Sequence, residues 1–263
     1  MFVIIKGAGD LASGIALRLH HAGFDMAMTE IAAPLSVRRT VSFSQAVYEG
    51  RAQVEDVGAV LVKDGAGMRA AWWLKQIAVF VDPHAGVVEE FRPDVLIDAI
   101  MAKKNTGTAL TDAPLVIGVG PGFSAGLDCH AVIETQRGHT LGRVITDGCA
   151  LPNTGVPGDI GGYTTERLLR SPSDGVFETL ASIGDVVKKG DVVALVNPGG
   201  LPVKAEIDGI LRGLLPSGIA VKQGMKAGDV DPRCERTHCF TVSDKALAIG
   251  GGVLEAMLRF NPS

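Results

Sequence analysis

Short apolar runs alternate with helical patterns along the first 120 residues of the chain. The apolar runs cover residues 2–6, 26–29, 59–63, 78–82, 95–99 and 115–119. They are brief and apolar on both faces, as is typical of strands that helices cover from either side. After the first run, Leu11, Ile15 and Leu19 recur every four residues and form the apolar stripe of a helix. Because right-handed crossovers join strands that alternate with helices, we predict an α/β fold with a parallel, doubly wound sheet.

The pattern changes after residue 120. Residues 121–165 combine glycine-rich loops with two β-rich runs, which predicts a hairpin followed by irregular structure. Residues 166–235 contain a repeat at a spacing of 34 positions, with Asp-Gly and Lys-x-Gly turns that predict a small quasi-symmetric β module. The identical pairs are Asp174/Asp208, Gly175/Gly209, Leu180/Leu214, Gly184/Gly218, Val187/Val221, Lys188/Lys222 and Gly190/Gly224.

The duplicated pattern resembles the biotinyl/lipoyl-like barrel-sandwich hybrid. In carrier domains of that fold, a hairpin between the two halves presents a lysine for modification. Lys204 stands near the corresponding connection here but lacks the Met-Lys-Met type of context. We therefore expect a structural, lid or docking role for this module and no swinging arm.

A C-terminal helix is predicted from Ser243, which is a good N-cap. Three consecutive glycines, Gly250 to Gly252, would each weaken this helix by about 1 kcal/mol relative to alanine, so we expect its backbone to press against a neighbouring element. The chain thus divides into a Rossmann-like nucleotide- or cofactor-binding domain (1–120), a glycine-rich hairpin and loop segment (121–165), a barrel-sandwich-like repeat module (166–235) and a C-terminal helix (236–263).

Composition narrows the class of protein. The formal net charge is −4, which does not indicate the clustered basic face of a nucleic-acid-binding protein. No run reaches the roughly 18 apolar residues of a membrane span, and the first residues lack the features of a signal peptide, so we expect a soluble cytoplasmic protein. The cysteines at 129, 149, 234 and 239 show no CxxC pair and no second ligand pair, so neither a disulfide framework nor a metal site is expected.

The loop KGAGDLASG at residues 6–14 raises the question of nucleotide binding. Gly7, Gly9 and Ala12 fit GxGxxA, a variant of the dinucleotide fingerprint, between a predicted strand and a predicted helix. Glu30 follows at the end of the next strand, where a carboxylate would hold ribose hydroxyls. The loop therefore predicts a phosphate-bearing ligand at the start of the first helix.

Asp10 argues against a routine NAD site. It places a negative charge where a pyrophosphate would bind, at a cost on the order of 4 kcal/mol for like charges about 4 Å apart. Lys6, Arg38 and Arg39 are the cations that would offset this charge, and arginine suits a phosphate or a pterin-like heterocycle. The alternative is a purely structural turn, with Asp10 as a helix cap and the arginines as a solvated pair.

Two further strings add candidate residues. GVGPG at 118–122 would form an anion-binding nest of backbone N–H groups, or simply a turn-rich exit from the last strand. Arg137 and His139 lie in the predicted hairpin turn. No catalytic residue and no metal ligand is assigned. The candidate cofactor-binding residues are Gly7, Gly9, Asp10, Ser13, Glu30, Arg38, Arg39, Gly118, Gly120, Gly122, Arg137 and His139.

Seven strings, in order along nearly the whole chain, are similar to the YqeB-type accessory proteins of the selenium-dependent molybdenum hydroxylase system. They are GAGDLASGIALRL, RRTVSFSQAVYEG, GVGPGFSAGLDCHAVIETQRGHTLGRV, PNTGVPG, AEIDGILRGLL, KAGDVDPR and SDKALAIGGGVLEAML. The resemblance implies a cytoplasmic protein that acts in maturation of a molybdenum cofactor or its enzyme. It adds Gly138 and the segment Asp231–Arg233 to the candidate site residues.

Three functions follow as hypotheses. The leading one is a maturation factor that binds a nucleotide or a phosphorylated molybdopterin-type cofactor at the N-terminal glycine loop, with a molybdenum hydroxylase or cofactor-synthesis protein as its partner. The second is an NAD(P)-binding oxidoreductase, although no proton donor stands at a recognisable spacing. The third is a non-catalytic scaffold whose repeat module docks a partner enzyme.

Overall fold

The computed structural model describes residues 1–260. The chain forms two compact units, each assembled from segments that are far apart in the sequence. Unit 1 comprises Met1–Pro34, Ser42–Asn153 and Val242–Ser263, and unit 2 comprises Leu35–Val41 and Thr154–Thr241. The early segment Leu35–Val41 thus belongs with the repeat module, and the C-terminal helix belongs with the N-terminal residues.

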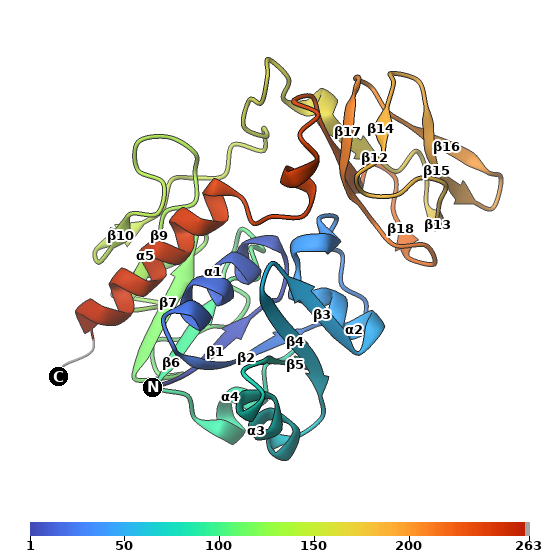
Figure 1. The fold of residues 1–263 in the computed structure, drawn as a ribbon. Coiled ribbons are helices and arrows are strands. Elements are labelled where there is room, and N and C mark those ends of the chain that lie inside the picture. The colour runs from blue at the N-terminus through green and yellow to red at the C-terminus, as the bar shows by residue number, and fades with distance from the viewer. Residues whose placement is uncertain (261–263) are drawn as a thin grey trace. The chain divides into compact units, whose positions relative to one another are not determined.

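Unit 1 is built on a nine-stranded mixed sheet. Its strands are β1 (Phe2–Lys6), β2 (Asp25–Glu30), β3 (Arg51–Val54), β4 (Val57–Val62), β5 (Ile77–Val81), β6 (Val95–Asp98), β7 (Leu115–Val119), β9 (Ala131–Ile133) and β10 (Val144–Ile145). They lie in the order β10-β9-β7-β6-β1-β2-β5-β4-β3 (Figure 1). The strands from β9 to β4 in this order run parallel, and the edge strands β10 and β3 run antiparallel to their neighbours. A separate antiparallel pair is formed by β8 (Ser124–Ala125) and β11 (Gly148–Cys149).

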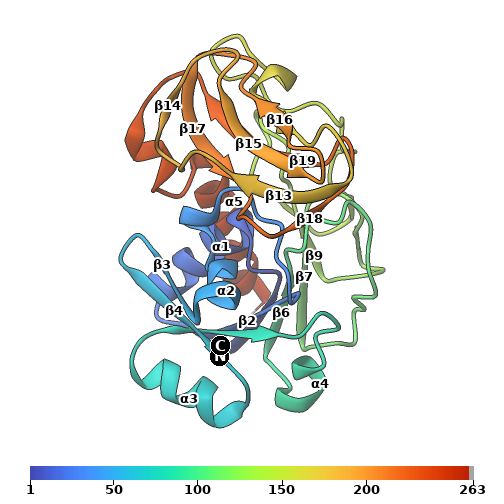
Figure 2. The same cartoon turned by 90° about the vertical axis from the view of Figure 1, so that its right-hand side faces the viewer.

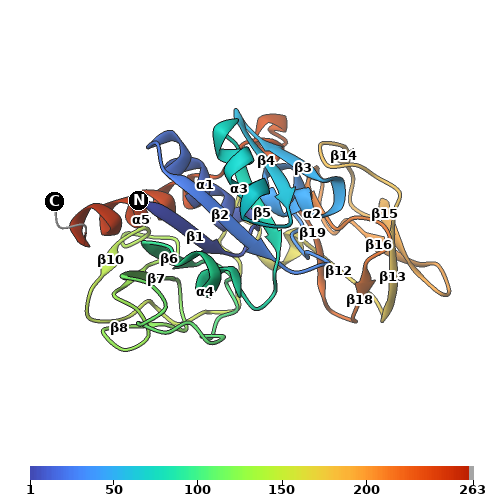
Figure 3. The same ribbon diagram turned by 90° about the horizontal axis from the view of Figure 1, so that it is seen from below.

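Helices cover both faces of this sheet. α1 (Asp10–His21) and α5 (Asp244–Phe260) pack side by side on one face (Figure 1). α3 (Gly65–Trp73) and α4 (Val87–Phe91) connect strands in the opposite direction along the sheet from α1, so right-handed crossovers place them on the other face. Figure 3 shows α4 on that face. The single turn α2 (Ala46–Glu49) precedes β3. Within residues 1–260, no helix has the length and apolar character that a membrane crossing requires.

Glycines allow α5 to approach its neighbours closely. A Cβ at Gly14 of α1 would lie 2.5 Å from the Cβ of Ala246. A Cβ at Gly250 would lie 3.0 Å from the carbonyl oxygen of Gly14, and one at Gly252 would collide with the carbonyl oxygen of Gly142. The expected close approach at the glycine run is confirmed, because α1 lies against one side of the helix and the loop before β10 lies against the other.

Unit 2 consists of two four-stranded antiparallel sheets (Figure 2). Its strands are β12 (Leu168–Arg170), β13 (Gly175–Thr179), β14 (Val186–Val187), β15 (Val192–Asn197), β16 (Leu201–Lys204), β17 (Gly209–Leu214), β18 (Ala220–Val221) and β19 (Lys226–Asp231). One sheet has the order β12-β19-β17-β14 and the other has the order β16-β15-β13-β18. Phe177 and Leu211, which occupy equivalent positions in the two repeats, are both fully buried in the core.

Reciprocal contacts relate the two halves of unit 2. Several bonds from the first repeat to the second recur 34 residues later as bonds from the second repeat back to the first. These contacts are the Phe177 amide with the Ile219 carbonyl and the Leu211 amide with the Asp185 carbonyl, together with the ion pairs Asp174–Lys222 (2.8 Å) and Asp208–Lys188 (3.1 Å). The halves therefore pair as the subunits of an isologous dimer do.

The predicted fold class, a Rossmann-like parallel domain followed by a barrel-sandwich module and a helix, is wrong. The large sheet is mixed, it continues past residue 120 through β9 and β10, and the C-terminal helix covers one of its faces. Unit 2 is a pair of antiparallel sheets together with the segment Leu35–Val41, which forms no strand. An apolar run looks the same whether its neighbour is parallel or antiparallel, so the hydropathy pattern does not reveal the direction of the edge strands.

Gly252→Ala should destabilise the protein, because the added methyl group would collide with the Gly142 carbonyl, and overpacking of this kind costs about 1–3 kcal/mol. Gly251→Ala is the matched control in the same helix. Its Cβ meets no atom within 4 Å, and alanine is the better helix former by about 1 kcal/mol, so this change should stabilise the protein. Urea unfolding followed by circular dichroism measures both shifts. Shifts of the same sign and size would contradict the contact between α5 and the Gly142 loop.

Candidate functional site

The glycine loop after β1 is filled by the protein's own atoms. The Gly7 amide donates to the Thr29 carbonyl at 2.9 Å, and the Ala8 amide donates to Oε2 of Glu30 at 3.1 Å. Ser13 is fully buried, and its hydroxyl donates to the Ala8 carbonyl at 3.1 Å. Ala8 itself has no exposed surface. The loop is a packed junction between β1, β2 and α1.

Glu30 serves this loop. Its Oε1 accepts the Ile31 amide at 2.8 Å while Oε2 accepts the Ala8 amide. Burial raises the pKa of the Glu30 carboxyl above its usual range, and these two amide bonds offset only part of that effect. Gly9 precedes α1 with an extended backbone, and Asp10 lies in the first turn, where its charge suits the helix N-terminus.

The second glycine loop is also explained by packing. A Cβ at Gly118 would collide with the ring of Phe123, and one at Gly122 would lie 2.6 Å from the backbone of Lys104. The Gly120 amide donates to the end of β9 at 2.9 Å. These glycines admit neighbouring chain segments, which accounts for their presence without a bound anion.

The remaining candidates lie apart from these loops. Arg137 donates to both carboxylate oxygens of Asp244 at 2.7 and 2.9 Å, and His139 is exposed. Arg38 and Arg39 belong to unit 2. Arg38 donates to the carbonyls of His238 and Thr241, both at 3.1 Å, and Arg39 donates to the carbonyl of Leu214 at 2.7 Å.

A charged centre is found instead where β19 of unit 2 ends. Asp231 is fully buried, and Arg233 donates to it from its amide (3.1 Å), from Nε (2.9 Å) and from NH2 (2.6 Å). Arg212 NH1 lies 3.6 Å from Asp231 Oδ2, and His238 Nδ1 lies 3.9 Å from the same oxygen. We call Asp231, Arg212, Arg233 and His238 the arginine centre.

Opposing effects act on the Asp231 carboxyl. Burial favours its neutral form, but the hydrogen bonds from Arg233 and the charges of Arg233 and Arg212 outweigh burial and hold the pKa of Asp231 below its usual range. The group is therefore a carboxylate near neutral pH. It orients the two guanidinium groups, which are planar donors well suited to anions.

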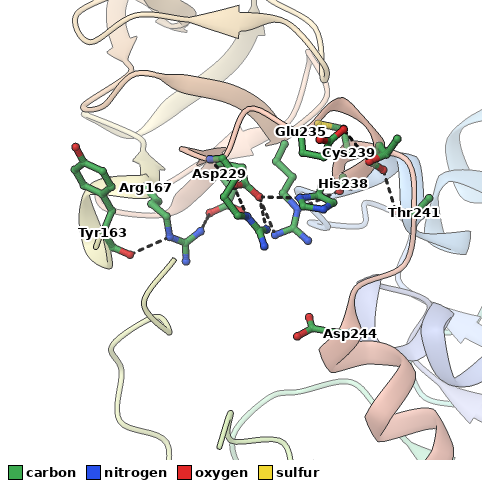
Figure 4. Close-up of polar contacts among 12 residues, drawn as sticks. Tyr163, Arg167, Asp229, Glu235, His238, Cys239, Thr241 and Asp244 are labelled. Atoms are coloured by element: carbon green, nitrogen blue, oxygen red, sulfur yellow. Dashed lines mark hydrogen bonds and ion pairs between the residues drawn. The ribbon is translucent and has the colours of Figure 1, made fainter. Parts of the chain in front are cut away.

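A second buried ion pair lies beside the centre on the same strand. Arg167 donates to Asp229 Oδ1 at 2.9 Å and also to the carbonyls of Tyr163 (3.3 Å) and Gly158 (3.1 Å). Asp229 and Asp231 are two residues apart on β19 and so project from the same face. Figure 4 shows Arg167, Asp229 and His238 along one edge of unit 2.

The sequence repeat allows the residues at the end of β19 to be compared with those at the end of β15. Thirty-four residues earlier, Asn197 replaces Asp231 and Glu178 replaces Arg212, while Gly199 and Lys204 stand in place of Arg233 and His238. At that turn Asn197 Nδ2 donates to Glu178 Oε2 at 2.7 Å in an exposed contact. The end of β15 therefore carries no arginine centre; the chain there continues into β16, whereas after β19 it enters the 3-10 helix Arg236–Cys239.

Sequence reasoning found only part of this site. Asp231 and Arg233 are candidates through the resemblance, whereas Arg212, Arg167 and His238 are not among the residues that the sequence singles out. Within residues 1–260, no three His, Cys, Asp or Glu side chains are grouped in a way that could hold a metal ion. The usable signal was the repeat itself, since a comparison of positions 178 and 197 with 212 and 231 reveals where the two halves diverge.

No family model matches the chain. A protein of Escherichia coli K12, described as uncharacterized protein YqeB, is 51% identical over 256 residues, which make up 97% of this chain and 47% of that protein. The chain therefore spans about half the length of the curated relative that it matches.

Three solved structures show a weak likeness to the chain. An aspartoacylase family protein from Mesorhizobium loti is 12% identical with a TM-score of 0.28, and a succinylglutamate desuccinylase from a Silicibacter species is 13% identical with a TM-score of 0.27; each likeness covers 87% of this chain and 84% of the other. The ectoine utilization protein EutE from Ruegeria pomeroyi is 15% identical with a TM-score of 0.24, over 79% of this chain and 58% of the other. At such low TM-scores the likeness carries no activity over to this chain.

The predicted role in molybdenum hydroxylase maturation is wrong. The loop that was expected to bind a nucleotide or pterin cofactor directs its Gly7 and Ala8 amides to Thr29 and Glu30 of the protein itself. The NAD(P)-dependent alternative depended on the same loop, and the scaffold alternative depended on the same pathway, so both are withdrawn.

Asp231→Asn should lower the free energy of unfolding by roughly 3 kcal/mol at pH 7, because removal of one member of a buried ion pair leaves the other charge uncompensated. The folded-state pKa of Asp231 is depressed, so its contribution is present above the ordinary value of 3.8 and is lost as the pH falls through the folded pKa. The difference between variant and parent should therefore shrink in acid.

Denaturant unfolding at several pH values checks this expectation. Asn197→Ala, at the equivalent turn, is the control and should leave the pH dependence unchanged, since its contact with Glu178 is exposed. A penalty for Asp231→Asn that does not change with pH would contradict the electrostatic role assigned to this carboxylate.

Proposed function

We propose that unit 2 binds a small dianion, such as a phosphate ester or a dicarboxylate, at the arginine centre. The divergence of the two repeats carries this proposal. At the end of β19, Arg212, Arg233 and His238 surround a buried aspartate, whereas the corresponding end of β15 carries Asn197 in an exposed contact with Glu178. A cluster of guanidinium groups at only one of the two strand ends points to an anionic ligand.

The chemistry of the centre favours an anion. A guanidinium group has five N–H donors in a fixed plane, a geometry that matches the oxygens of a carboxylate or phosphate. The Arg233 side chain is 44% exposed, so a ligand can reach it from solvent. Arg212 and Arg233 make further contacts as well, so the anion would join an existing network.

The centre is also held in place before any ligand arrives. Arg212 Nε donates to the His238 carbonyl at 3.1 Å, and Arg38 donates to the same carbonyl. Arg236 is fixed by the Gly184 carbonyl at 2.8 Å. Side chains that are already ordered lose little conformational entropy when they bind, and this favours affinity.

We also propose the type of protein to which the chain belongs and its location in the cell. We propose that the chain is part of a YqeB-type protein, which the identity of 51% to the E. coli relative supports. We place it in the cytoplasm, which four cysteines without disulfides support. The role of the arginine centre concerns unit 2 alone.

Sulfate and malonate should bind the purified chain in isothermal titration calorimetry at constant ionic strength, and acetate should bind far more weakly because it carries one charge. Arg233→Ala should weaken sulfate binding at least tenfold, a typical loss for one charge-assisted contact of about 1.4 kcal/mol or more. Arg233→Lys should retain an intermediate affinity, because lysine keeps the charge but loses the planar fork.

Arg170→Ala is the matched control, since Arg170 is an exposed arginine on β12 of the same unit. Circular dichroism of each variant verifies that unit 2 is folded. The proposal fails if neither dianion binds, or if folded Arg233→Ala binds sulfate as tightly as the parent chain.

A further inference from the structure

Among the residue types of the arginine centre, histidine is the one whose side chain ordinarily changes charge near neutral pH, and His238 supplies it. Its Nδ1 is a buried atom, and among residues 1–260 no hydrogen-bond partner meets it. Within residues 1–260, the acidic group at ion-pair range of Nδ1 is Asp231 Oδ2, at 3.9 Å. The side chain as a whole is 36% exposed, so the exposed surface belongs to its other atoms. A buried polar atom without a hydrogen bond is uncommon and requires an explanation.

The position of the imidazole is set by its backbone. His238 lies in the short 3-10 helix Arg236–Cys239, and its carbonyl accepts hydrogen bonds from Arg38 and Arg212. The next residue, Cys239, is fully buried and anchors the segment to β17. The ring therefore has a fixed place between the aspartate and solvent.

The charges around the imidazole oppose one another. Asp231 on β19 lies at ion-pair range of the ring, and Arg212 on β17 and Arg233 in the turn surround the same carboxylate. An arriving anion would offset the guanidinium charges and place a second negative charge near the exposed edge of the ring. Both effects favour the imidazolium form.

We infer that His238 is a ligand-binding residue of the arginine centre and that it takes up a proton when the dianion binds. This inference rests on the proposed function and adds the protonation state to it. The bound anion then lies between an imidazolium, which Asp231 holds at Nδ1, and the guanidinium of Arg233. The site would accordingly discriminate against monoanions, which offset less of the positive charge, and its affinity would fall as the pH rises.

Sulfate is the suitable probe because it does not itself titrate near neutral pH. Calorimetric titrations of the parent chain with sulfate at pH 7, in buffers of different ionisation enthalpy, should show net proton uptake on binding. The affinity should fall about fivefold or more between pH 6 and pH 8, as linkage to one proton requires.

Two variants separate a ligand-binding role from a structural one. His238→Gln should lose both the proton uptake and the pH dependence, with affinity at pH 6 reduced at least fivefold. His238→Lys should bind sulfate with little pH dependence because its charge persists. His84→Gln, at an exposed histidine of unit 1, is the control and should behave as the parent chain.

The outcomes distinguish this inference from the proposed function. If sulfate binds without proton uptake and His238→Gln binds it equally well, the role of His238 is overturned while anion binding by unit 2 stands. If no dianion binds the parent chain under any condition, the proposed function itself fails. Proton uptake that persists unchanged in folded His238→Gln would assign the proton to another group and overturn the inference.

Discussion

The hydrogen bonds that join the two halves of unit 2 are the constraint on which the candidate site depends. The Phe177 and Leu211 amides each reach across to the other half, and the ion pairs at Asp174 and Asp208 repeat the same exchange at the surface. These contacts bring two turns to equivalent places in one framework. The chain leaves these turns differently, into β16 after the first and into the 3-10 helix Arg236–Cys239 after the second, and only the second carries the arginine centre.

The arginine centre is such a departure, and it is costly to maintain. A carboxylate with no exposed surface loses its hydration, and only well-placed partners make its ionised form acceptable. Arg233 provides three hydrogen bonds and Arg212 a nearby charge, so the pKa of Asp231 falls despite burial. The equivalent Asn197 and Glu178 meet in solvent and bear no such cost. The difference in burial between the two turns makes unit 2 asymmetric in chemistry while it remains nearly symmetric in fold.

Unit 1 illustrates how close packing removes a site that a motif suggests. The amides of Gly7 and Ala8 are directed to Thr29 and Glu30, and Ser13 closes the loop from the helix side. The glycines at 118 and 122 make room for Phe123 and Lys104. In both loops, the freedom of glycine is used for the approach of another chain segment. A glycine-rich string therefore indicates close approach, but it does not say what approaches.

Several features of this protein are determined by the sequence itself, because they depend on neighbours along the chain. The apolar runs predict the central strands, and the spacing of Leu11, Ile15 and Leu19 predicts α1. The glycine run in α5 predicts that the helix backbone lies close to a neighbouring segment. The sequence repeat with a spacing of 34 residues likewise predicts that two similar β-units pair with each other in unit 2.

Only the tertiary structure decided which partners the charged groups meet. Arg38 donates to carbonyl groups about 200 residues away in the sequence, and Arg167 donates to Asp229, which is 62 residues away. Glu30 turns back to the loop beside it, although the same carboxylate at the end of a strand would serve a ribose equally well. Hydropathy is a local property that the order of residues expresses directly. The partner of a buried charge is set by which distant segments pack together, and that depends on the whole fold.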